Sequence, residues 1–114
     1  MADFDIKALT DNLEAGNGCG LKSALERSRF PEQEQVFDAI REEALGRPDN
    51  KLSFEKREVR IDKPNGDDTG LRIPVLDIRN SGNIIWEAFK PPGQDAVFGA
   101  CKGKFVDQEQ PEKK

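Results

Sequence analysis

Residues 31–61 decide the fold, and they have the sequence PEQEQVFDAIREEALGRPDNKLSFEKREVRI. In the first half, four apolar residues share one face at helical spacing: Val36, Phe37, Ile40 and Ala44. Pro31 suits the first turn of a helix, and Gly46 suits its end. After about Asn50 the apolar residues alternate with polar ones, as they do along a strand. The stretch therefore predicts a helix over residues 31–45 that is followed by β-structure.

The alternation within residues 52–61 changes parity. Leu52 and Phe54 lie on one face of an extended chain, whereas Val59 and Ile61 lie on the other. A regular strand cannot bury both pairs against a single layer. We therefore expect a β-bulge in this strand, or a strand of which only the second half pairs.

Two shorter helices are expected before residue 31. Their apolar residues recur at helical spacing: Ile6, Leu9 and Leu13 in the first, and Leu21, Ala24 and Leu25 in the second. The pattern predicts helices over about residues 4–15 and 21–28. Gly16 can end the first helix in the left-handed conformation.

The loop between these helices, residues 16–20, has the sequence GNGCG. A glycine-rich loop before a helix can bind an anion through its backbone N–H groups. Dinucleotide-binding loops of that kind follow a strand, however, and this one follows a helix. We interpret it as a turn between helices, in which Cys19 packs as a small apolar residue.

The second half of the chain predicts strands and turns only. Three further strands are expected: Leu71 to Val75, Ile84 to Phe89, and Ala96 to Val106. With the strand near residue 55 they form an antiparallel meander of about four strands, so the predicted class is α+β with three N-terminal helices. We expect one domain over residues 1–106, made of a helical part (4–46) and a β part (52–106), and a disordered tail over residues 107–114.

The composition predicts a domain with a modest core. Hydrophobic residues make up 35% of the 114 residues, and charged residues make up another 35%. The residues expected in the core are those on the apolar faces: Leu9, Leu13, Leu25, Val36, Phe37, Ile40, Ile73, Trp86 and Phe98.

Charge and hydropathy indicate where the protein acts. The net charge is −4, and its distribution is uneven, since residues 1–50 hold eleven acids against six bases and so carry −5. The chain has no apolar run long enough to span a bilayer, and its acidic N-terminus does not resemble a secretory leader. We therefore expect a cytoplasmic protein that does not bind membranes, with Cys19 and Cys101 as free thiols.

The residue types present exclude several kinds of chemistry. The chain contains no histidine and no tyrosine. This excludes Ser-His and Cys-His nucleophiles and zinc sites with histidine ligands, so we expect no enzyme, no cofactor and no metal. One loop gathers polar residues that could suggest calcium: Asp62, Asn65, Asp67 and Asp68. Their spacing does not fit an EF-hand, so we interpret the loop as a polar turn.

The third helix carries the first candidate binding surface. Its apolar residues point inward, which leaves Glu34, Asp38 and Glu42 on the outward face. A solvated face explains such a pattern without any function. If the face has a role, it favours a partner protein with a basic patch. The leading hypothesis is therefore a non-catalytic protein-binding module, with no pattern that predicts an oligomeric state.

The last two strands carry an alternative surface. Aromatic residues and lysines interleave there, and the candidate nucleic-acid contacts are Trp86, Lys90, Lys102 and Lys104. Stacking platforms for single-stranded nucleic acids have this composition. The alternative hypothesis is a nucleic-acid-associated regulator, which the acidic balance of the chain disfavours. An enzyme of undefined type ranks third.

Residues 4–45 also resemble a known group of proteins. The order Ile6, Leu9, Leu13, Gly16, Cys19, Leu21, Leu25, Pro31, Glu32, Phe37 and Ala39 is similar to the opening of small regulator-like proteins encoded by actinobacterial phages. The pattern of that family continues into a helix-turn-helix, whereas residues 52–61 here have a strand pattern. The resemblance implies a phage or mobile-element origin, which suits an inhibitor or adaptor, and it supplies no functional residue.

Overall fold

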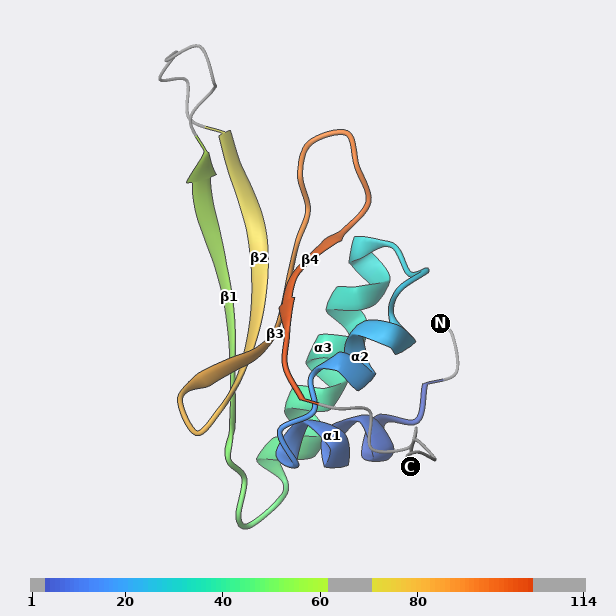
Figure 1. Ribbon diagram of the computed structural model, residues 1–114, viewed down its shortest axis with the longest axis vertical. Coiled ribbons are helices and arrows are strands. Elements are labelled where there is room, and N and C mark those ends of the chain that lie inside the picture. The colour runs from blue at the N-terminus through green and yellow to red at the C-terminus, as the bar shows by residue number, and fades with distance from the viewer. Residues whose placement is uncertain (1–3, 62–70, 104–114) are drawn as a thin grey trace, which may run out of the picture.

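The computed structural model describes residues 4–61 and 71–103, which form three helices followed by an antiparallel sheet (Figure 1). The elements are α1 (Ile6–Glu14), α2 (Cys19–Ala24), α3 (Phe30–Leu45), β1 (Leu52–Ile61), β2 (Leu71–Asn80), β3 (Asn83–Phe89) and β4 (Val97–Cys101). The strands lie in the order β1-β2-β3-β4. The α+β class and the order of helices before strands are confirmed. Residues 52–61, where the phage-encoded regulators continue into a helix-turn-helix, form the strand β1 here.

Side chains at the helix ends explain where α1 starts and stops. The carboxylate of Asp5 accepts a hydrogen bond from the backbone N–H of Ala8 at 3.1 Å, as an N-cap does. Gly16 follows the last turn with a φ of 88°, which is the predicted left-handed stop. The side-chain amide of Asn80, at the end of β2, donates to the carbonyls of Leu13 and Glu14 at 2.9 and 3.1 Å. This contact joins the end of α1 to the sheet.

The core lies between the helices and one face of the sheet. Trp86 in β3 is fully buried there, and the ring of Phe37 in α3 meets that of Phe54 in β1 edge-on, with centroids 5.5 Å apart. The expected core residues are buried except Phe98, which is half-buried and packs on Trp86. Ile73 is buried but lies outside this core, on the other face of the sheet.

Both alternatives predicted for β1, a bulge and the pairing of its second half alone, are wrong. β1 pairs with β2 in one unbroken register, from Leu52 opposite Asn80 to Ile61 opposite Leu71. Phe54 faces the helices, whereas Val59 faces the opposite side and lies across from Ile73. The apolar pattern changes parity because the two ends of this strand bury opposite faces. Register shifts occur elsewhere, between β2 and β3 and between β3 and β4.

The expectation of free thiols is also wrong, because the structure joins Cys19 to Cys101 in a disulfide. The backbone N–H of Gly18 donates to the carbonyl of Lys102 at 2.6 Å, which holds the loop between α1 and α2 beside the end of β4. A side chain at Gly18 would clash with the carbonyl oxygen of Ile85, so only glycine permits this close approach. The loop over residues 16–20 is a turn, as expected, but Cys19 forms a disulfide and does not pack as a free thiol. Because disulfides are rare in the reducing cytoplasm, the crosslink does not support the expected cytoplasmic location.

Some expectations fall outside the described residues. They concern the polar turn with Asp62, Asn65, Asp67 and Asp68, the residue Lys104, and the tail over residues 107–114. Within the described part of the chain, no helix is both long and apolar enough to cross a bilayer.

Candidate functional site

The acidic face predicted on α3 is partly used within the chain. The ammonium group of Lys56, in β1, lies 3.2 Å from a carboxylate oxygen of Glu34 and 3.1 Å from one of Asp38. The hydrogen bond to Asp38, and then that to Glu34, raises the pKa of Lys56, while partial burial opposes them. Glu42 is exposed and forms no ion pair with residues 4–61 or 71–103. Two of the three predicted carboxylates, those of Glu34 and Asp38, therefore form ion pairs between α3 and the sheet.

Among the described residues, the predicted nucleic-acid contacts do not lie on one surface. Trp86 is 0% exposed beneath the helices, so its ring is not available for stacking on a base. Lys90 follows the end of β3 that pairs with the start of β4, whereas Lys102 follows the far end of β4. The two lysines therefore lie at opposite ends of this strand pair, and no platform joins them.

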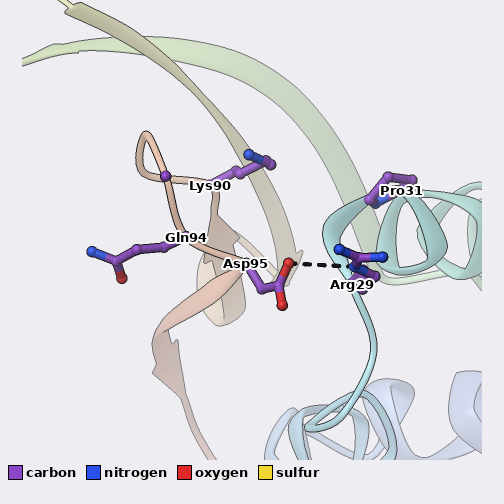
Figure 2. Close-up of a pocket in the computed structure, with 6 residues that line it drawn as sticks. Arg29, Pro31, Lys90, Gln94 and Asp95 are labelled. Carbon is purple, nitrogen blue, oxygen red and sulfur yellow. Dashed lines mark ion pairs between the residues drawn. The ribbon is translucent and has the colours of Figure 1, made fainter.

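A polar cleft of about 540 Å³ separates the start of α3 from the loop between β3 and β4 (Figure 2). Its walls are Arg29, Pro31, Lys90, Gly93, Gln94 and Asp95. The guanidinium of Arg29 lies 3.6 Å from the carboxylate of Asp95 across the cleft, while Gln94 points away from it. Both charged side chains are largely exposed, at 81% and 66%, so water screens this pair and it stabilises little.

The sheet face turned away from the helices, which we call the open face, has a different character. It carries the side chains of alternate strand residues: Glu55, Arg57, Val59, Ile73, Val75, Asp77, Arg79, Glu87, Phe89 and Val97. Figure 1 shows the helices gathered on the other side of the sheet, with β1 and β2 extending beyond them. A hollow of about 220 Å³ lies on the open face, lined by Arg57, Val59, Ile73, Val75, Glu87 and Phe89.

Charged residues border this hollow in an unusual order. Glu55, Asp77 and Glu87 stand directly opposite one another across β1, β2 and β3, and we call them the acidic row. Like charges in such positions destabilise a sheet. Arg57 offsets part of the repulsion, since it donates to Asp77 at 2.7 Å and to Glu87 at 2.9 Å. Arg79 lies more distantly, 4.0 Å from Asp77.

The acidic row is not fully balanced from within. Asp77 is 0% exposed, and one of its carboxylate oxygens, Oδ1, has no hydrogen-bond donor among the described residues. Loss of hydration raises the pKa of Glu87 above its ordinary value of 4.5. The hydrogen bond that a protonated Glu87 makes to Asp77, and the charge of Asp77, raise this pKa further, while Arg57 lowers it. The acidic row has three carboxylates and the neighbouring Arg57 and Arg79 have two guanidinium groups, so the net charge of this cluster is −1.

Sequence reasoning missed this site because its members come from three strands. Asp77 stands between Leu76 and Ile78, and this single acid within an apolar strand was the signal available. Only the strand register shows that Glu55 and Glu87 flank it. In the part of the chain that the structure describes, no acids or cysteines converge as metal ligands do. Comparisons with protein-family models, curated proteins and solved structures found no match.

Proposed function

We propose that this chain is a non-catalytic protein-binding module that holds its partner on the open face of the sheet. The observation that carries this proposal is the direction of the apolar side chains at the far end of β1 and β2. Val59 and Ile73 point away from the helices of their own chain and line the hollow. Ile73 is already buried, whereas Val59 and Phe89 are half-buried at the hollow, and a partner can supply the second layer that would cover them.

The other candidate surfaces have weaker support. Lys56 already engages Glu34 and Asp38, so the face of α3 offers a basic partner mainly Glu42. A nucleic acid would meet the surplus negative charge of the acidic row, which repels phosphate. The resemblance to phage-encoded proteins favours an inhibitor or adaptor within the protein-binding class. The disulfide favours action in an oxidising compartment over the cytoplasm.

A random-peptide library selected on the folded protein tests the proposal. Val59→Gln places a polar group at the hollow, whereas Glu58→Gln alters the neighbouring residue, whose side chain is exposed on the opposite face. We expect selected peptides to bind Val59→Gln about tenfold more weakly than the unaltered chain, and to bind Glu58→Gln normally. Failure to select any peptide, or equal binding to both variants, would overturn the proposal.

A further inference from the structure

We infer that the partner presents a lysine or arginine side chain to the acidic row, next to the apolar group that enters the hollow. This inference rests on the proposed function, since it specifies the chemistry of a partner that binds the open face. The acidic row and the hollow are neighbours on the open face, because Glu87 belongs to the row and also lines the hollow. One apolar and one cationic side chain, close together on the partner, would fit both.

The surplus charge is the first argument. Glu55, Asp77 and Glu87 face Arg57 and Arg79, so the cluster keeps a net charge of −1. Glu55 is exposed and Glu87 is 22% exposed, so a group from outside can reach both. Asp77 lies between them and adds its charge from below. A hydrogen bond between a cation and a carboxylate is about twice as strong as one between neutral groups.

The unpaired oxygen of Asp77 is the second argument. A buried acceptor without a donor destabilises a protein by about 1–3 kcal/mol. The Oδ1 atom of Asp77 is in this state among the described residues, although Arg57 binds the other oxygen. A cation held by Glu55 and Glu87 would compensate this charge. Arg57 already pairs with Asp77 and Glu87 within the chain, so a cation from a partner would balance the one negative charge that remains.

The same charge argues against other occupants of the open face. A second copy of the chain would bring a second acidic row against the first, and the two rows would repel. Anionic lipids and phosphate groups meet the same repulsion. The carboxylates do not converge as the ligands of a metal ion do within the described residues. A basic segment of another protein satisfies both the charge and the hollow.

Peptides selected on the folded protein, as described above, also test this inference. We expect them to be enriched in lysine or arginine beside an aliphatic residue. Glu87→Gln, which keeps the size of the side chain, should weaken the best peptide about tenfold, and Glu42→Gln should leave it unchanged. A second peptide, in which glutamine replaces the basic residue, completes a double-mutant cycle. The unaltered chain and Glu87→Gln should bind this second peptide equally, because the interaction that Glu87 would make is then already absent.

The outcomes separate this inference from the proposed function. Peptides that lose binding to Val59→Gln, yet show no basic residue or bind Glu87→Gln normally, would overturn the inference and leave the proposed function standing. An equal loss with Glu42→Gln would also overturn it, since the effect would then be one of overall charge. A dimer in sedimentation that Val59→Gln dissociates would identify a second copy as the occupant and overturn both.

Discussion

At the scale of one residue, the ionised carboxyl group of Glu87 is stabilised by Arg57 and destabilised by Asp77. It accepts a hydrogen bond from Arg57, and it stands opposite the buried carboxylate of Asp77. Its raised pKa means that ionisation destabilises the folded chain. The resulting stability is fully present below the ordinary pKa of 4.5, and it is lost as the pH rises through the higher pKa of the folded state.

Glu87→Gln should therefore raise the melting temperature at neutral pH. A glutamine still accepts from Arg57 through its carbonyl oxygen, and its amide can donate to the unpaired oxygen of Asp77. Well below the ordinary pKa of 4.5 the gain should vanish, because Glu87 itself is then protonated in both states. Thermal unfolding followed by circular dichroism, at neutral and at acid pH, measures both effects. A lower melting temperature at neutral pH would show that Arg57 requires an ionised partner.

At the scale of elements, the contact between α3 and β1 joins the helical layer to the sheet. Phe37 is 1% exposed, and its ring meets Phe54 on one side while the ammonium group of Lys56 lies 5.8 Å from its centroid. Phe37→Ala should lower the free energy of unfolding by about 3–5 kcal/mol, because it leaves a cavity between the layers. Urea unfolding measures this loss. Leu45→Ala is the control within the same helix, since Leu45 is 67% exposed and should change stability by less than about 0.5 kcal/mol. Equal effects of the two changes would contradict the described core.

The existence and order of the elements could be predicted, because each depends on neighbours in the sequence. Their bounds were less accurate: α2 (Cys19–Ala24) lies earlier than the predicted 21–28, and β2 continues beyond Val75 to Asn80. The helix predicted over residues 31–45 is α3, one residue longer at its start, and the alternation after Asn50 gave β1. The contacts between elements could not be predicted in the same way. The acidic row pairs residues 10 and 22 positions apart, and the disulfide joins residues 82 positions apart. Nothing in the local pattern around Cys19 or Cys101 predicts which segments meet, although the glycines at Gly18 and Gly103 are needed for the close approach.

At the scale of the whole molecule, the disulfide links α2 to the edge strand β4. It joins Cys19 to Cys101, so nearly the entire described chain lies within one covalent loop. Replacing both cysteines by serine should lower the free energy of unfolding by about 2–5 kcal/mol, mainly because the unfolded chain gains freedom. Urea unfolding of this variant, beside the oxidised and the reduced protein, measures the loss. The crosslink would be contradicted by two reactive thiols in the oxidised protein. It would also be contradicted if the serine variant, the oxidised protein and the reduced protein unfolded at the same urea concentration.

The two faces of β1 also constrain how this protein can evolve. Phe54 serves the core and Val59 serves the open face, and they are separated by an odd number of positions on one regular strand. A single inserted or deleted codon between them, without a compensating β-bulge, would turn one end of the strand over, and would send either Phe54 out of the core or Val59 toward the helices. Changes of two codons keep both faces. A change of one residue in the length of this strand therefore needs a β-bulge to keep both faces in place, whereas the composition of its two ends is free to diverge under separate selection.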